Sequence, residues 1–159
     1  MALEIERKFL VATDGWKSQL QNSLGERFCQ GYLSRAPVTV RVRTITLGLS
    51  KKAVITIKGQ TTGVTRDEFE YDAPYDDAVQ MLALCAGPKI EKTRFYVVNP
   101  DDPTHVWHVD VFDGDNKGLI TAEIELKSET EKFIMPKWIG KEVSDDHRYY
   151  NTNLPLLSA

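Results

Sequence analysis

The chain has 159 residues, of which 42% are hydrophobic and 27% charged, a composition ordinary for a soluble protein with a sizeable core. Its net charge of −3 argues against non-specific nucleic-acid binding, which usually requires a basic imbalance. The charged N-terminal residues and the lack of a long apolar run argue against a signal segment and a membrane span. We therefore expect residues 1–159 to form a single domain in the cytoplasm, where Cys29 and Cys85 stay reduced.

Most segments alternate with a period of two, which is typical of strands. In chain order, the predicted strands are 3–11, 28–34, 38–45, 53–58, 66–71, 90–98, 106–112 and 120–127. A short helix is allowed at 19–24, and a longer one is predicted at 76–85, capped by Asp76 and ended by Gly87-Pro88. After Ser128 the pattern becomes helical or irregular, over 129–134, 138–143 and 145–150. Short strands separated by close turns predict an antiparallel sandwich or barrel.

Charged residues gather on one face of these strands. Carboxylates are spaced two residues apart on three strands, and cations are spaced in the same way on two others: Glu4/Glu6, Glu68/Glu70, Glu123/Glu125, Arg41/Arg43 and Lys92/Arg94. An antiparallel sheet with one solvated face is the ordinary explanation for such alternation. Like charges at this spacing repel, however, so folding alone gives no reason to pair them, whereas a shared ligand does.

The two kinds of charge suit two kinds of ligand. Carboxylates suit Mg²⁺ or Mn²⁺, which prefer oxygen ligands, and clustered arginine and lysine suit the oxygens of phosphate. Closing the sheet would place both sets in one narrow lumen. The predicted fold is therefore mainly β (α+β): an eight-stranded antiparallel closed β-barrel, or tunnel, with a charged interior and helices packed outside.

Other phosphate and metal sites have no support in the sequence. It contains no Gly-x-x-x-x-Gly-Lys-Ser/Thr motif for a P-loop and no Gly-x-Gly-x-x-Gly motif for a dinucleotide fold. The histidines at 105, 108 and 147 lack the spacing of a zinc site. Side-chain cations and metal must therefore replace the backbone amides that hold phosphate in P-loops.

The sequence resembles the CYTH, or triphosphate tunnel metalloenzyme, family over nearly its whole length. The resemblance rests on short motifs in a fixed order, among them Glu4-Ile5-Glu6-Arg7-Lys8, Gln30-Gly31-Tyr32-Leu33, Arg41-Val42-Arg43, Ile57-Lys58, Arg66-Asp67-Glu68-Phe69-Glu70, Glu91-Lys92-Thr93-Arg94, Val109-Asp110-Val111-Phe112 and Glu123-Ile124-Glu125. The short bacterial members are the most similar in style. The resemblance implies an eight-stranded tunnel that takes compounds bearing a triphosphate.

The resemblance also implies roles for individual residues. The residues implied to bind the phosphate chain are Lys8, Arg41, Arg43, Lys58, Lys92 and Arg94. Those implied to bind metal directly or through water are Glu4, Glu6, Glu123 and Glu125, with Asp110 as a weaker candidate. Glu68 and Glu70 are implied to orient the basic residues or to help place metal-bound water. Tyr32 and Lys58 are candidates for activating the attacking water, and a glutamate of the fifth or eighth strand is the alternative base.

We hypothesise Mg²⁺- or Mn²⁺-dependent hydrolysis of inorganic tripolyphosphate to pyrophosphate and phosphate. A class IV type adenylate cyclase and a thiamine triphosphatase are the alternative enzymes, since they would use the same residues. The segment Val38-Thr39-Val40 before Arg41 departs from the His-Phe expected of the cyclases. A non-catalytic module that binds polyphosphate is the third reading, although it does not need three carboxylate pairs. A homodimer is compatible with the sequence.

Overall fold

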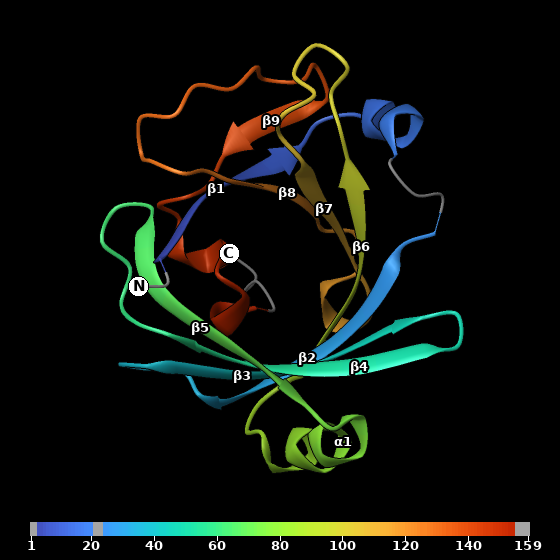
Figure 1. The fold of residues 1–159 in the computed structure, drawn as a ribbon, viewed down its shortest axis with the longest axis vertical. Helices are drawn as coiled ribbons and strands as arrows, with labels where there is room; N and C mark the ends of the chain where they lie inside the picture. Colours follow the sequence, from blue (N-terminus) through green and yellow to red (C-terminus); the bar gives the residue numbers. More distant parts are fainter. Residues whose placement is uncertain (1–2, 21–23, 155–159) are drawn as a thin grey trace.

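The computed structural model describes residues 3–20 and 24–154, and its main feature is a closed antiparallel barrel (Figure 1). The strands are β1 (Leu3–Val11), β2 (Glu26–Ser34), β3 (Thr39–Leu47), β4 (Ser50–Lys58), β5 (Thr65–Ala73), β6 (Ile90–Val97), β7 (Trp107–Phe112), β8 (Ile120–Glu125) and β9 (Ile139–Glu142). Their order is β5-β4-β3-β2-β6-β7-β8-β1-β9, and pairing of β5 with β1 closes the ring. The predicted eight-stranded closed barrel is confirmed, with β9 as an additional strand.

The alternation of each strand decides what faces the lumen and what faces outward. On β1, the carboxylates of Glu4 and Glu6 and the amine of Lys8 face inward, and Phe9 packs into an apolar layer outside the barrel. The ring of the fully buried Trp107 lies at the centre of that layer. Its centroid is 5.6 Å from the ring of Phe9 and 5.8 Å from that of Trp138. The main core of this protein thus lies around the barrel, and not within it.

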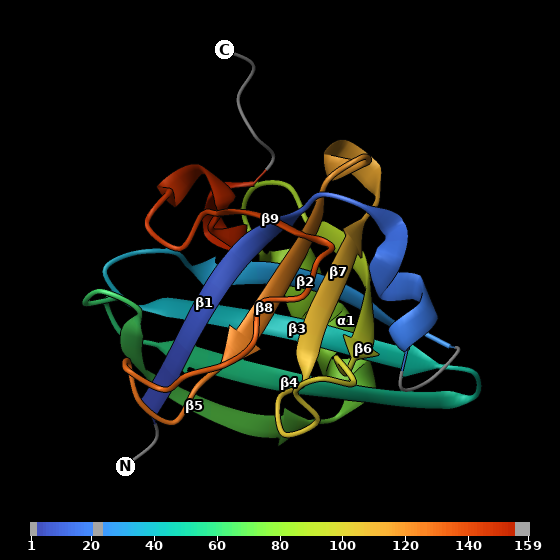
Figure 2. The ribbon, with the colours of Figure 1, turned by 90° about the horizontal axis from the view of Figure 1, so that it is seen from above.

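Two segments cover different apolar parts of the outer face of the barrel. Helix α1 (Tyr75–Leu84) packs Ala78 and Leu82 against Val42 and Ala53, over β3 and β4. Its close approach depends on Gly31 of β2, because a Cβ atom there would lie 3.0 Å from the Cβ and Sγ atoms of Cys85. The chain after β8 covers the other side and ends in β9, as Figure 2 shows. Within residues 3–20 and 24–154, no helix combines the length and apolar character needed to cross a lipid bilayer.

The structure corrects the predictions at several places. Residues 138–143 were expected to be helical or irregular, but β9 forms there because β5 pairs with β1 only at Leu3–Ile5 and leaves the rest of that strand edge free. Helix α1 begins one residue early, with Pro74 and not Asp76 at its N-cap. A 3₁₀ helix, η1, forms at Asp14–Gln19, just before most of the segment 19–24 for which the sequence allows a short helix. Residues 21–23 of that segment lie outside the described residues.

The chain near the C-terminus also differs from a regular helix. Two 3₁₀ helices, η3 (His147–Tyr149) and η4 (Asn151–Asn153), form there, and residues 129–134 are irregular. Figure 2 shows η3 and η4, in red, at one end of the barrel. This segment contributes to the lumen, as described below.

A histidine holds the irregular chain after β8 against the turn before β7. His105 Nδ1 lies 2.9 Å from the carboxylate of Asp102, and Nε2 lies 2.5 Å from Glu131. Asp102 also accepts a hydrogen bond from the backbone of Ile134 at 2.9 Å. Hydrogen bonding to Asp102 and Glu131 raises the pKa of His105 above its usual range, because both ring nitrogens face an acceptor.

The histidine contact makes stability depend on pH. A raised pKa in the folded state stabilises the protein fully below the unfolded pKa, near 6.5, and that contribution is lost as pH rises through the higher folded value. We expect His105→Asn to lower the free energy of unfolding by about 1 kcal/mol more at pH 5.5 than at pH 9. Urea titrations at both pH values measure this difference. His147→Asn, at an exposed histidine, is the control, and an equal loss for His105→Asn at both pH values would contradict the prediction.

Candidate active site

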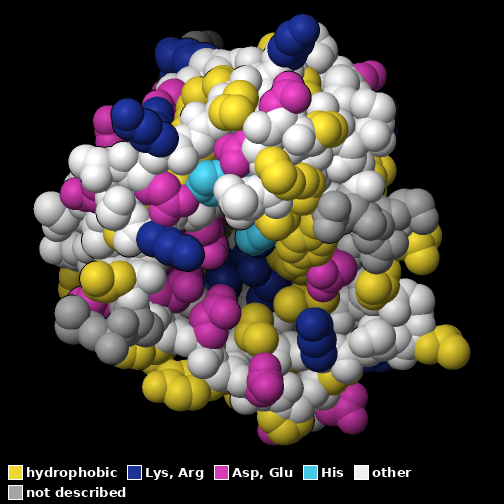
Figure 3. Space-filling view, turned by 45° about the horizontal axis from the view of Figure 1, so that its top comes forward, with side chains coloured by type: hydrophobic (Ala, Val, Ile, Leu, Met, Phe, Trp, Pro, Cys, Tyr) yellow, Lys and Arg dark blue, Asp and Glu magenta, His cyan; other side chains and the backbone are white. Residues whose placement is uncertain are grey.

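A cavity of about 220 Å³ occupies the barrel lumen and carries charges of both signs on its wall. All the predicted site residues except Lys92 and Asp110 line it: Glu4, Glu6, Lys8, Tyr32, Arg41, Arg43, Lys58, Glu68, Glu70, Arg94, Glu123 and Glu125. In Figure 3, lysine and arginine side chains form the floor of a hollow, and aspartate and glutamate side chains lie along part of its rim, beside hydrophobic ones. The closed barrel therefore brings together charges that lie far apart in the sequence.

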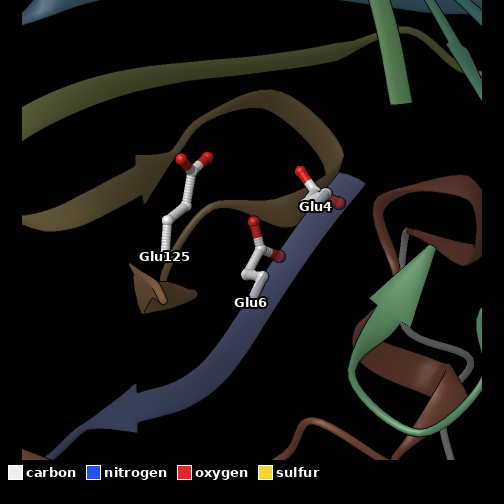
Figure 4. A group of neighbouring side chains, drawn as sticks. All are labelled: Glu4, Glu6 and Glu125. Atoms are coloured by element: carbon white, nitrogen blue, oxygen red, sulfur yellow. The ribbon is translucent and has the colours of Figure 1, made fainter. Parts of the chain in front are cut away.

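Three carboxylates meet at the junction of β1 and β8. Glu4, Glu6 and Glu125 each place one oxygen within 4.8 Å of the others (Figure 4). Glu6 lies directly opposite Glu125 in the strand register, an arrangement of like charges that destabilises a sheet. Burial, with the negative charges of Glu123 and Glu4, raises the pKa of Glu6 well above its usual range. Partial desolvation and the charge of Glu4 also raise the pKa of Glu125, although its side chain reaches solvent. A hard divalent cation, which prefers oxygen ligands, fits this donor set.

Glu4 connects the acidic cluster to two cations. Its carboxylate lies 3.1 Å from Lys58 Nζ and 3.0 Å from Arg66 Nε. Burial alone would raise the pKa of Glu4, but Lys58, a hydrogen bond with Glu68 and Arg66 together lower it to about 2. Lys58 also lies 3.1 Å from Glu68. Burial and the contact with Glu4 raise the pKa of Glu68 to about 7.

Glu123 belongs to a different group from the three clustered carboxylates. Lys8 Nζ lies 3.3 Å from one of its oxygens, and an Arg94 nitrogen lies 3.5 Å from the other. Burial would raise the pKa of Glu123, but Lys8 and Arg94 lower it well below its usual range. Lys8 also donates to the backbone oxygen of Tyr149 at 3.1 Å. In this structure Glu123 therefore orients two cations.

Lys92 and Asp110 lie behind the cavity wall. Both side chains are fully buried, and Lys92 Nζ lies 2.7 Å from Asp110. Asp110 also receives two hydrogen bonds from Arg94, at 2.8 and 2.9 Å. Burial, with the nearby charges of Arg94 and Arg43, lowers the pKa of Lys92 to about 7. The strand repeat predicted the inward direction of Lys92 and Asp110 but not their depth behind Arg94.

The arginines of β3 are held by neutral groups. Arg41 donates to the hydroxyl of Thr56 at 3.1 Å, and its nearest carboxylate is Glu70 at 3.8 Å. Arg43 Nε donates to the side-chain oxygen of Gln30 at 2.7 Å. Burial and the charges of Arg41 and Arg94 lower the pKa of Arg43 well below its usual range. The guanidinium groups thus keep donors available to an anion.

Several further residues line the lumen or support its wall. Arg66 lines the cavity, and Gln30 lies buried behind its wall, where it is bonded to Arg43 and Tyr32. Both share the inward face of their strands with predicted site residues, so the two-residue repeat could have identified them. The C-terminal segment adds Ser144, Tyr150, Asn151 and Thr152 to the cavity wall. These residues follow no strand repeat, so the two-residue pattern does not place them in the lumen.

Comparisons with known proteins agree with this architecture. The CYTH domain family model matches residues 2–152. An inorganic triphosphatase of Acetivibrio thermocellus is 42% identical over 97% of this chain and 94% of its own length. An inorganic triphosphatase of Nitrosomonas europaea is 34% identical over 96% of this chain and 97% of its own length.

The solved structures agree as well. A crystal structure of an inorganic triphosphatase superposes with a TM-score of 0.66 at 32% identity, covering 99% of this chain and 97% of that one. The resemblance seen in the short sequence motifs is thereby confirmed, and this chain belongs to the CYTH domain family.

Proposed function

We propose that the protein hydrolyses inorganic tripolyphosphate to pyrophosphate and phosphate with the help of Mg²⁺ or Mn²⁺. One observation carries the proposal: a single cavity brings the clustered carboxylates of Glu4, Glu6 and Glu125 together with a wall of lysine and arginine. Phosphoryl transfer requires positioning and charge neutralisation far more than covalent chemistry, and this wall can supply both. The relatives that carry the name inorganic triphosphatase support the same substrate.

The basic wall would hold the phosphate chain. Lys8, Arg41, Arg43, Lys58 and Arg94 all reach the cavity, and arginine binds phosphate oxygens in a bidentate manner. We assign Lys92 and Asp110 to the support of Arg94, since both are buried behind it. Glu68 and Glu70 would orient Lys58 and Arg41, their ion-pair partners at 3.1 and 3.8 Å.

We assign the metal to Glu4, Glu6 and Glu125, with Glu123 acting through Lys8 and Arg94. A divalent cation bound there would neutralise phosphate oxygens and favour attack on the terminal phosphorus. Tyr32 and Lys58, which share the cavity wall, would orient the attacking water. Cys29 and Cys85 are free thiols, which supports a reducing compartment such as the cytoplasm.

A substrate panel tests the proposed reaction. The purified protein is incubated with tripolyphosphate, thiamine triphosphate, ATP or GTP, each with Mg²⁺ or Mn²⁺, and phosphate, pyrophosphate and cyclic AMP are measured. We expect tripolyphosphate to give the highest kcat/KM and equal amounts of pyrophosphate and phosphate. Cyclic AMP from ATP, or a preference for thiamine triphosphate, would replace the proposal with an alternative enzyme. Binding of tripolyphosphate without turnover under either metal would indicate a non-catalytic module.

The double variant Glu4→Gln/Glu6→Gln tests the metal assignment. Replacing two charged ligands by neutral amides should lower kcat/KM by on the order of a thousandfold, as measured by phosphate release across a range of Mn²⁺ concentrations. Glu91→Gln is a matched control, because this exposed glutamate of β6 lies outside the cavity. Full activity in the double variant would remove these residues from the metal site.

Glu123→Gln and Glu125→Gln should have different effects, although the two residues belong to one strand motif. Glu125→Gln removes a proposed metal ligand at an exposed position, so we expect the Mn²⁺ concentration for half-maximal activity to rise about tenfold with little change in Tm. Glu123→Gln leaves Lys8 and Arg94 short of a buried partner, so we expect a clear fall in Tm. If the two variants had equal metal dependence and equal Tm, the assignment of Glu125 to metal binding and of Glu123 to the support of Lys8 and Arg94 would be contradicted.

A further inference from the structure

Arg43 differs from the other cations of the lumen in its partners. Lys8, Lys58, Lys92 and Arg94 each lie within 3.3 Å of a carboxylate, and Arg41 lies 3.8 Å from one. Among the residues that the structure describes, no carboxylate makes an ion pair with Arg43, although its side chain is buried. Leaving a buried cation unpaired is costly. Folding alone therefore does not explain why this guanidinium has a neutral partner.

The neutral partner is Gln30, which lies opposite Arg43 in the β2–β3 register and is fully buried. Its Oε1 accepts a hydrogen bond from Arg43 Nε at 2.7 Å. Because a guanidinium can only donate, the amide must turn its oxygen toward Arg43 and its NH₂ group the other way. That NH₂ group donates to the hydroxyl oxygen of Tyr32 at 3.3 Å. One side chain thus fixes the orientation of two residues on the cavity wall.

The phenyl ring of Phe28 completes the setting of Arg43. The guanidinium carbon lies 4.3 Å from the ring centroid, a cation–π contact that holds the plane without cancelling the charge. With Nε bound to Gln30, the two terminal nitrogens remain available to the two oxygens of a phosphate group. The hydroxyl of Tyr32, whose oxygen accepts from Gln30, keeps its hydrogen free to donate elsewhere.

We propose that Gln30 is a positioning residue that aims Arg43 at a substrate phosphate and orients the hydroxyl of Tyr32, while leaving the charge of Arg43 unpaired until an anion binds. This inference rests on the proposed binding of tripolyphosphate in the lumen. It explains why an amide stands where a carboxylate would form another cross-strand ion pair, like those of Lys8 with Glu123 and Lys58 with Glu68.

The isosteric variant Gln30→Glu separates this role from simple packing. A carboxylate at position 30 would fill the same space and accept from Arg43 Nε, but it would also neutralise the guanidinium. We expect an unchanged or higher Tm without ligand, together with about tenfold weaker binding of tripolyphosphate. A residue with only a structural role would move Tm and affinity in the same direction.

Binding is measured calorimetrically with tripolyphosphate in the presence of EDTA, and turnover is measured separately with Mn²⁺. This arrangement distinguishes the two proposals. If the wild-type protein binds tripolyphosphate but does not hydrolyse it, the proposed function fails and the affinity comparison still tests Gln30. Gln80→Glu is the control, since it adds the same charge on the exposed side of α1 and should leave affinity unchanged.

Two further variants complete the test. In an Arg43→Gln background, Gln30→Glu should cause a smaller loss of affinity than it does alone, because the guanidinium that it neutralises is already gone. Gln30→Met keeps the volume but leaves Arg43 and Tyr32 without their partner, so we expect kcat to fall and KM to rise. Wild-type affinity in Gln30→Glu, or additive losses in the double variant, would overturn the proposal.

Discussion

The closed antiparallel barrel is the constraint on which the rest of this protein depends. In a closed ring of strands, every second side chain of each strand must point into a narrow lumen. The sequence places charged residues at those positions and apolar residues at the alternate ones. As a consequence, the apolar layer that stabilises the fold lies around the barrel, against α1 and the chain after β8. The lumen is left free for a ligand.

Opposite charges stabilise this lumen, and the register of the strands decides where they meet. Lys8 faces Glu123 across one strand pair, and Arg94 faces Asp110 across another. At two places the cross-strand pair does not combine opposite charges: Glu6 lies opposite Glu125, and Arg43 lies opposite Gln30. Both places destabilise the empty protein, one by gathering negative charge and the other by leaving a cation unpaired. A metal ion at the first place and a phosphate at the second would relieve the two imbalances together.

The sequence predicted the directions of these side chains better than their depths. A two-residue repeat identifies the inward face, so Glu4, Glu6 and Lys8 could be assigned to the lumen from the first strand alone. How deeply a side chain is buried behind the cavity wall depends on the stagger of neighbouring strands, which the sequence of one strand does not reveal. The family resemblance made Asp110 a weaker candidate for metal binding, and the strand repeat could not show that the fold buries it between Lys92 and Arg94. Strand β9 was missed for a related reason, since it forms only where β5 leaves the edge of β1 free.

The shared edge of β1 has a consequence for the order in which the chain can fold. Leu3–Ile5 pair with β5, the backbone of Glu6 donates to Val64, and the amide of Lys8 donates to the hydroxyl of Ser144. The strand that carries Glu4 and Glu6 precedes its partner strands in the sequence, and its hydrogen bonds are completed only by residues more than a hundred positions later. Such long-range pairing is slow to form. During synthesis the edges of β1 must therefore remain unpaired, and the lumen can bind a ligand only after β8 and β9 have formed their pairs with β1.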